Sequence, residues 1–165
     1  MTVKFVSAKD VAHEVFHKER VYILDVRDKE ASEDWRIEGD NVQLINIPFK
    51  ELSDSDSAEL KELPKDRPLY TVCGKGNDSK KAAAYLQENG FGNVYSIDGG
   101  MASWSEQLEP VKIGEVAGGA IYQFVRLGKG CLSYLIESDG EAAVVDASRV
   151  TEHYEKFAKE KGIKI

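Results

Sequence analysis

The stretch "YTVCGKGNDSKK" (residues 70–81) places a cysteine at the junction of two structural signals. The apolar run before it, residues 69–72, is typical of a buried strand. Glycines and small polar residues follow, and "SKKAAAYLQENG" (79–90) has the pattern of a helix that begins at a serine cap and ends at a glycine. We therefore expect a strand–loop–helix unit with Cys73 at the carboxyl end of its strand.

Strands and helices alternate on both sides of this unit. Apolar runs at 21–26, 43–48 and 93–100 indicate further strands, and amphipathic or polar segments separate them. The nearly continuous run "VYILDV" (21–26) suits a parallel sheet buried on both faces. The pattern predicts the α/β class, a parallel sheet flanked by helices, in which ligands bind at the carboxyl ends of the strands.

The overall composition is that of a globular protein. The chain has 165 residues, of which 42% are hydrophobic and 31% charged, and a net charge of −7. The acidic balance argues against nucleic acid as a partner. No apolar run approaches the roughly 20 residues that a membrane helix needs, and the first residues lack an apolar signal segment. We expect a cytoplasmic protein with no membrane partner.

The few cysteines and histidines indicate neither a disulfide framework nor a metal site. Cys73 and Cys131 are the only cysteines. Cys131 has apolar neighbours, which favours a small hydrophobic residue buried in a strand. His13 and His17 lie one helical turn apart, a spacing that can hold a metal, but no third ligand follows in the sequence nearby. A surface-facing helix is the favoured interpretation, with no metal and no cofactor in this chain.

The surroundings of Cys73 predict a reactive thiolate. Glycines after the cysteine allow successive backbone N–H groups to turn toward one point, and the helix that begins near Ser79 adds the positive end of its dipole. Lys75, Lys80 and Lys81 add positive charge close by. Each unit by which these groups lower the thiol pKa corresponds to about 1.4 kcal/mol. We expect Cys73 to act as a nucleophile.

Four segments of residues 1–110 resemble motifs of the rhodanese family, in the same order. They are "ILDVRD" (23–28), "EDWRIEG" followed by "INIP" (33–48), "CGKGNDS" (73–79) and "DGGMASW" (98–104). The resemblance implies a rhodanese-like sheet and a sulfurtransferase in which Cys73 accepts a sulfane sulfur as a persulfide. It also implies that the loop holds that sulfur, which makes the expected substrate-binding residues Gly74, Lys75, Gly76, Asn77, Asp78 and Ser79.

Three positions depart from the family pattern. Asp78 stands where the loop usually has arginine, Asp40 where histidine is usual, and Gln43 where glycine is usual. An aspartate in the loop repels an anionic donor such as thiosulfate and tends to raise the thiol pKa. We therefore expect a thiol persulfide as the donor, with a thiol or cyanide as the acceptor.

Three other functions are alternatives to sulfur transfer. Phosphatases of the cell-cycle type share this sheet and need an arginine six residues after the cysteine, but Ser79 stands there, which makes phosphoryl transfer an unfavourable interpretation. A non-catalytic rhodanese-like module, serving binding or regulation, remains the alternative, with Asp78 as the mark of lost activity. A truncated fusion protein that only assembles is a third hypothesis.

Asp25 and Arg27 lie at another strand end and could be catalytic. Buried opposite charges usually pair for structural reasons, so we favour an internal ion pair that ties the strand to a neighbouring loop.

The pattern changes after Pro110. "AIYQFVRLGKGCLSYLIESDGEAAVVDAS" (120–148) predicts three strands joined by hairpins, "RVTEHYEKFAKEKG" (149–162) a helix, and "IKI" the start of another strand. We expect a domain over 1–110, a linker over 111–116 and a β-rich segment over 117–165.

Residues 117–165 resemble the amino-terminal part of a metallo-β-lactamase-fold domain, an αββα architecture. The resemblance implies a fusion of the persulfide dioxygenase type, with a metal expected only in the part of that domain absent from this chain. Strand edges and apolar faces left exposed by such a segment invite pairing with another chain, so a homo-oligomer is expected to form through them.

Overall fold

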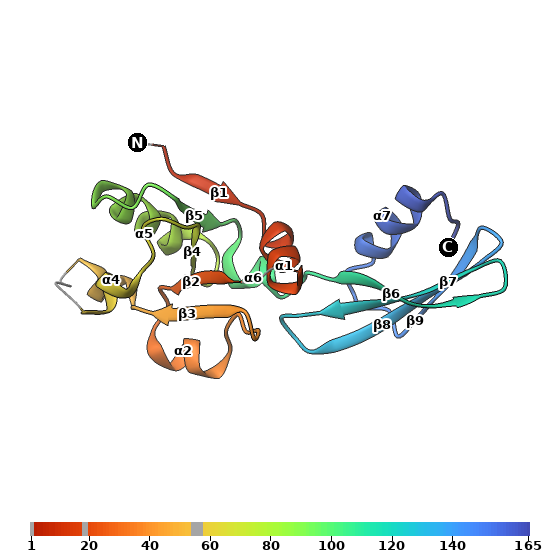
Figure 1. The fold of residues 1–165 in the computed structure, drawn as a ribbon. Coiled ribbons are helices and arrows are strands. Elements are labelled where there is room, and N and C mark those ends of the chain that lie inside the picture. Colours follow the sequence, from red (N-terminus) through yellow and green to blue (C-terminus); the bar gives the residue numbers. More distant parts are fainter. Residues whose placement is uncertain (1, 18–19, 54–57) are drawn as a thin grey trace. The chain divides into compact units, whose positions relative to one another are not determined.

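The computed structural model describes residues 2–17, 20–53 and 58–165 (Figure 1). Contacts between residues divide the chain into two compact units, Met1–Ser105 and Glu106–Ile165. Within the described residues, no helix combines the length and the apolar character needed to cross a membrane.

The first unit is built on a five-stranded sheet with the order β1-β5-β4-β2-β3. Every neighbouring pair of strands runs parallel, which confirms the α/β prediction for this unit. The central strand β4 is buried at all four positions, as expected of a strand covered on both faces. The strands are β1 (Lys4–Val6), β2 (Val21–Asp25), β3 (Val42–Asn46), β4 (Leu69–Val72) and β5 (Val94–Ile97).

Six helices accompany this sheet in the described part of the unit. They are α1 (Ala8–His17), α2 (Lys29–Asp34), α3 (Phe49–Leu52), α4 (Ala58–Glu62), α5 (Asn77–Glu88) and α6 (Gly100–Trp104). The start of α1 is fixed by a capping box, because the Ser7 hydroxyl donates to the Asp10 carboxylate at 2.7 Å and the Asp10 amide donates back at 3.0 Å. His13 and His17 are exposed on α1, as the surface-facing interpretation predicts.

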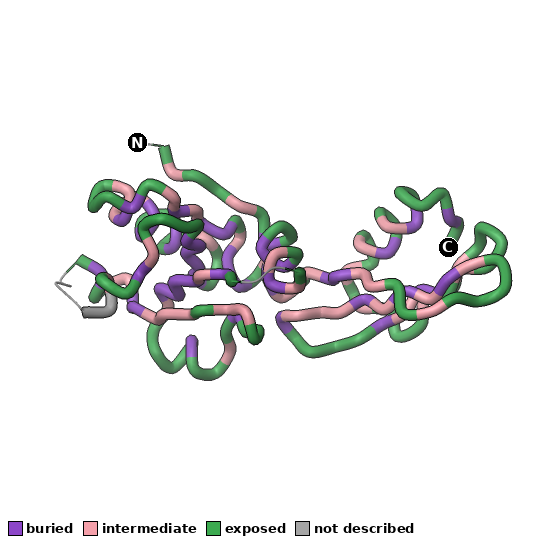
Figure 2. Tube along the Cα trace, viewed as in Figure 1, coloured by how far each residue is buried: buried purple, intermediate pink, exposed green. Residues whose placement is uncertain are grey.

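The core of the first unit extends to the end of β4. Buried side chains of β2, β4 and α5 pack together there, among them Leu24, Leu69 and Leu86, and Cys73 belongs to the same cluster. The buried residues of this unit are purple in Figure 2. This packing fixes the position of the strand end from which the cysteine loop begins.

The second unit is a four-stranded antiparallel sheet, β6-β7-β8-β9, with one helix. Tyr122, Phe124 and Leu135 from the sheet form a buried cluster with Tyr154 of the helix. Burial along β7 alternates residue by residue, so one face of the sheet carries this core. The elements are β6 (Glu109–Val116), β7 (Gly119–Arg126), β8 (Cys131–Ser138), β9 (Glu141–Val145) and α7 (Glu152–Lys161).

The prediction of a linker over residues 111–116 is wrong, because these residues form most of β6. Their backbone groups pair with β7, with a shift of register between Lys112 and Gly114. The pairing satisfies amide and carbonyl groups that would otherwise leave one edge of β7 bare. The turn at Gly118, where φ is +74°, was the overlooked hairpin signal.

Two further expectations for this unit are wrong. The "IKI" segment does not form a strand; Lys164 makes a single isolated parallel bridge with Glu141 of β9. Cys131 was expected to be buried, but it is exposed at the first position of β8. By the alternation of a strand Cys131 shares a face with the buried Ser133 and Leu135, but it lies at the end of β8, outside the buried cluster of this unit.

Candidate active site around Cys73

Cys73 lies at the carboxyl end of β4, where its side chain is nearly buried at 5% relative exposure. The backbone around it is held by α6. The amide of Met101 donates to the carbonyl oxygen of Cys73 at 2.8 Å, and the amide of Ala102 donates to that of Gly74 at 3.0 Å. The first turn of α6 therefore anchors the start of the cysteine loop.

Glycines permit this close approach of α6 to the loop. Gly100 has a φ of +58°, and a β-carbon there would overlap the carbonyl oxygen of Cys73 and lie 2.9 Å from the amide nitrogen of Gly76. Gly99 also has a positive φ, +68°. The "GG" of the "DGGMASW" segment is thus required both for its backbone conformation and for the space beneath the cysteine.

The sulfur of Cys73 is surrounded by hydrogen-bond donors. The amide of Gly76 donates to Sγ at 3.1 Å, and Sγ lies 3.4 Å from the hydroxyl oxygen of Ser79. Burial acts to raise the pKa of the Cys73 thiol, but hydrogen bonds from the Ser79 hydroxyl and from the amides of Ser79, Lys75 and Gly76 outweigh it. The net result is a pKa below the ordinary value.

The helix after the loop starts earlier than expected, which changes the role of Ser79. Gly76 stands at the N-cap with a φ of +92°, and α5 begins at Asn77. Ser79, expected to cap the helix, instead lies in its first turn and is fully buried. Its hydroxyl is therefore directed to Sγ of Cys73 rather than to the end of the helix.

The remaining residues of the expected substrate-binding loop face solvent. Gly74, Lys75, Asn77 and Asp78 are exposed, and Gly76 is half-buried. The structure thus brings the amides of this loop to the sulfur while leaving its side chains accessible from outside.

The charged groups near the site are arranged differently from the expectation. Asp78 forms an ion pair with Lys81 at 3.1 Å, on the exposed side of α5. Lys80 lies over the ring of Phe5, 5.7 Å from its centroid. The strongest influences on Cys73 are burial, Ser79 and backbone amides, so the expectation that Asp78 would raise the thiol pKa is outweighed.

Asp25 and Arg27 form the internal ion pair that was favoured. Arg27 binds the buried Asp25 carboxylate through Nε at 3.0 Å and Nη2 at 2.6 Å, and Nη2 also donates to the carbonyl oxygen of Trp35. The side-chain amide of Asn46 donates through Nδ2 to the carbonyl oxygens of both Asp25 and Arg27, each at 2.9 Å. These bonds tie the end of β2 to the end of α2 and to β3.

Two buried hydroxyl groups next to Ser79 were not predicted from the sequence. The Ser96 hydroxyl on β5 donates to Oγ of Ser79 at 3.0 Å, and the Thr71 hydroxyl on β4 donates to the carbonyl oxygen of Ser79 at 2.9 Å. Both residues have a relative exposure of 0%. A small polar residue inside an otherwise apolar strand was the available signal, because such a group needs a partner when buried.

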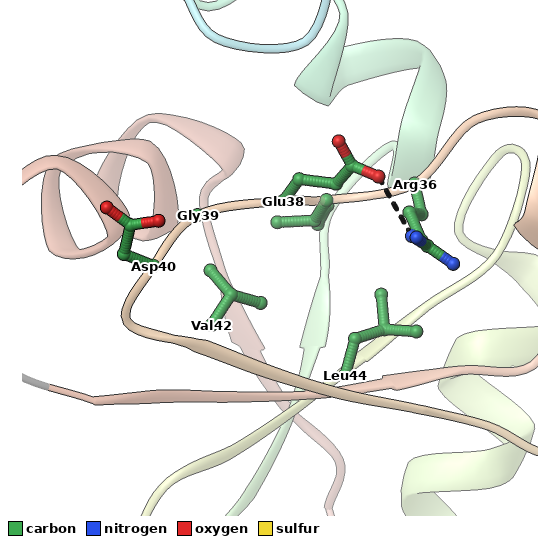
Figure 3. A pocket seen from close by; sticks show the side chains of 7 residues that line it. Arg36, Glu38, Gly39, Asp40, Val42 and Leu44 are labelled. Atoms are coloured by element: carbon green, nitrogen blue, oxygen red, sulfur yellow. Dashed lines mark hydrogen bonds and ion pairs between the residues drawn. The ribbon is translucent and has the colours of Figure 1, made fainter.

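A hollow of about 720 Å³ lies elsewhere in the first unit, along β3 (Figure 3). An exposed ion pair between Arg36 and Glu38, 2.9 Å long, lies at this hollow. Cys73 and its loop take no part in the lining, so the hollow is separate from the candidate active site. Its lining residues are Arg36, Ile37, Glu38, Gly39, Asp40, Val42 and Leu44.

Comparison with known proteins agrees with this geometry. Thiosulfate sulfurtransferase GlpE of Pseudomonas syringae pv. syringae is 42% identical over 82 residues, which cover 50% of this chain and 70% of that protein. The adenylyltransferase and sulfurtransferase uba4 of Ogataea parapolymorpha is 34% identical over 89 residues, 54% of this chain but 21% of that protein.

Solved structures give the same result for the fold. A rhodanese-like domain protein from Staphylococcus aureus, 28% identical, superposes with a TM-score of 0.52 over 62% of this chain and 91% of its own. The reduced CoADR-RHD of Bacillus anthracis, 32% identical, has a TM-score of 0.50 over 61% of this chain and 16% of its own. Residues 7–107 also match the family model described as a rhodanese-like domain. This chain belongs to the rhodanese-like family.

Proposed function

We propose that the chain is a sulfurtransferase that carries sulfane sulfur as a persulfide on Cys73. The observation that carries the proposal is the set of donors around Sγ, which lowers the pKa of a nearly buried thiol. A thiolate is the nucleophile that sulfur transfer needs, and backbone amides can hold the anionic outer sulfur of a persulfide as they hold the thiolate. The sulfurtransferases among its relatives support the same reaction class.

The reaction divides into two displacements. The Cys73 thiolate attacks the outer sulfur of a donor R–S–S⁻, forming a new S–S bond, while the donor's own S–S bond breaks and R–S⁻ leaves with the electron pair. An acceptor thiolate then attacks the outer sulfur of the Cys73 persulfide, and the Cys73 thiolate is released. Electrons and charge balance in each half, and no external oxidant or reductant is consumed.

The proposed donor is a low-molecular-weight thiol persulfide rather than thiosulfate. Asp78 keeps negative charge on the exposed side of the loop, and Lys81, its partner, is a single exposed lysine rather than a planar arginine within the loop. Thiosulfate brings two charges to the loop on one compact group and loses more from that arrangement than a thiol persulfide, whose sulfur end brings one.

Mass spectrometry of the loaded protein tests the proposal. The Cys131→Ser protein is incubated with glutathione persulfide or thiosulfate, desalted and weighed, since the exposed Cys131 would otherwise also react. We expect a gain of one sulfur, absent in the Cys73→Ser/Cys131→Ser protein, and faster loading from the persulfide. The proposal fails if no donor adds sulfur at Cys73.

The second candidate is a non-catalytic rhodanese-like binding module. The 5% exposure of Cys73 favours it, because a donor must reach a nearly covered sulfur. In that case the Cys73→Ser protein would bind its partners as the unchanged protein does, and neither donor would load sulfur.

We propose that the second unit corresponds to one half of a metallo-β-lactamase-type sandwich. We also propose that it mediates assembly. One face of its sheet packs on α7, while Leu132, Ile136 and Val145 on the other face are 45%, 40% and 43% exposed. An αββα sandwich covers such a face with a second sheet. In this chain we propose that the second sheet comes from a second copy.

A further inference from the structure

Two buried hydroxyl groups stand in a row behind the sulfur of Cys73. Ser79, in the first turn of α5, and Ser96, on β5, both have a relative exposure of 0%. The distances along the row are 3.4 Å from Sγ to Oγ of Ser79 and 3.0 Å from Oγ of Ser79 to Oγ of Ser96. Of the two serines, Ser79 is the one that contacts the sulfur, so any role of Ser96 acts through Ser79.

Counting protons along the row shows what Ser96 does. Each serine hydroxyl has one proton to donate and can accept through its oxygen. In the thiol form Cys73 donates to Ser79, whereas the thiolate has no proton and must accept the proton of Ser79. Ser96 donates to Ser79, so Ser79 already accepts a bond from behind and can give its own proton to the sulfur.

We propose that Ser96 is a positioning residue, whose hydroxyl donates to Ser79 and so keeps the Ser79 proton on the sulfur of Cys73 in its anionic form. The inference rests on the proposed function for its importance in sulfur transfer, although its direct consequence is an effect on the thiol. Chains of hydrogen bonds polarise one another in buried surroundings, and leaving a buried hydroxyl without a partner is costly. Both effects stabilise the thiolate.

Alkylation of Cys73 by iodoacetamide as a function of pH measures this effect. The experiment uses the full chain with Cys131→Ser, so that Cys73 is the only thiol. Ser79→Ala removes a hydrogen bond to a charged group and should raise the apparent pKa by about one unit or more. Ser96→Ala should raise it in the same direction by about a third of a unit, since neighbouring bonds strengthen one another by tens of per cent.

A double-mutant cycle separates positioning from a general structural effect. In the Ser79→Ala background the Ser96→Ala change should leave the thiol pKa where it is, because the link between them has gone. Thr71→Val serves as the matched control, since it removes an equally buried hydroxyl that bonds the carbonyl oxygen of Ser79 and not its Oγ. Thr71→Val should shift the pKa less than Ser96→Ala does.

Either of two results overturns the inference. The pKa of Cys73 in the Ser96→Ala protein could equal that in the parent protein, or the effect of Ser96→Ala on this pKa could persist in the Ser79→Ala background. Circular dichroism checks that each variant is folded. Should Ser96→Ala not fold, Ser96→Thr and Ser96→Val replace it, because they have the same shape and differ in the hydroxyl alone, and Thr is expected to give the lower pKa.

The two proposals fail in different ways. If the pKa pattern holds and Cys73 never gains sulfur, the positioning role stands and sulfur transfer fails. If Cys73 gains sulfur normally and Ser96→Ala leaves the pKa of Cys73 unchanged, sulfur transfer stands and the positioning role of Ser96 fails.

Discussion

Gly100 lies against the carbonyl oxygen of Cys73, so close that a β-carbon on Gly100 would overlap that oxygen. The same glycine has a φ of +58°, a conformation that side chains disfavour. Since Met101 donates its amide to that carbonyl at 2.8 Å, the helix α6 and the cysteine loop are held as one piece. A motif 25 residues away in the sequence therefore shapes the site.

We expect Gly100→Ala to lower the free energy of unfolding by about 2 to 4 kcal/mol, through backbone strain and overlap together. It should also raise the thiol pKa, because the Gly76 amide, 2.9 Å from the added β-carbon, must move. Urea denaturation and alkylation rates measure the two effects. Gly90→Ala is the control, since Gly90 has a φ of +87° but open space around it, and only the strain cost should remain.

The lowered pKa of Cys73 predicts a pH-dependent stability. The folded thiol ionises at a lower pH than the unfolded one, which titrates near its ordinary value of about 9. The stabilisation is therefore complete above pH 9 and is lost as the pH falls through the folded pKa. Urea denaturation between pH 6 and pH 10 should show this rise of stability with pH, and Cys73→Ser should remove that part of it. An identical profile in the two proteins would contradict the lowered pKa.

The sequence was sufficient for the parallel sheet and for the place of Cys73, because both depend on local patterns. Buried strands such as β4 are continuous apolar runs, and the glycines after the cysteine mark the loop. The row of hydroxyls behind the sulfur could not be predicted in the same way. Ser79 and Ser96 are 17 residues apart in the sequence and meet only because the start of α5 lies against β5.

Element boundaries were less predictable than the elements themselves. Ser79 carries the signature of a helix cap, yet Gly76 takes the N-cap position because its positive φ fits the turn before α5, which begins at Asn77. Residues 111–116 had no distinctive strand pattern of their own, and their pairing with β7 is a tertiary effect.

The buried pair of Asp25 and Arg27 is expected to be structural. Asp25→Asn leaves the guanidinium of Arg27, 12% exposed, without its negatively charged partner and should cost about 3 to 5 kcal/mol of unfolding free energy. Arg36→Ala breaks an exposed ion pair with Glu38 and should cost less than about 1 kcal/mol. Urea denaturation compares the two. A catalytic role would instead appear as lost sulfur transfer in an Asp25→Asn protein of unchanged stability.

The charge on Asp78 is expected to govern the choice between donors. Asp78→Asn should raise kcat/KM for thiosulfate by about two- to fivefold, the range that a screened surface charge supplies, and change that for glutathione persulfide less. Lys81→Met removes the ion-pair partner of Asp78 and should lower kcat/KM for thiosulfate. Equal effects on both donors would show that Asp78 does not discriminate between them.

The open face of the second unit is expected to mediate self-association. Register places Ile121 opposite Ile136, Val125 opposite Leu132 and Tyr134 opposite Val145 on that face. Its charged side chains are Glu109, opposite Val125, and Glu141, opposite Ser138. Four strands of up to eight residues give a whole face of roughly 500 Å². With projecting side chains, that face supplies much of the area of about 800 Å² per partner that a stable dimer buries.

Light scattering after size exclusion should therefore give a dimer mass that falls on dilution. Leu132→Lys/Ile136→Lys places positive charge at two points of the face and should give the monomer mass at every concentration, because each copy would bury charges against the other. Lys112→Glu, on the opposite side of the sheet from this face by its pairing with Tyr122, is the control and should leave the dimer intact. A parent protein that is monomeric at the highest concentration measured would exclude this surface as the contact between copies.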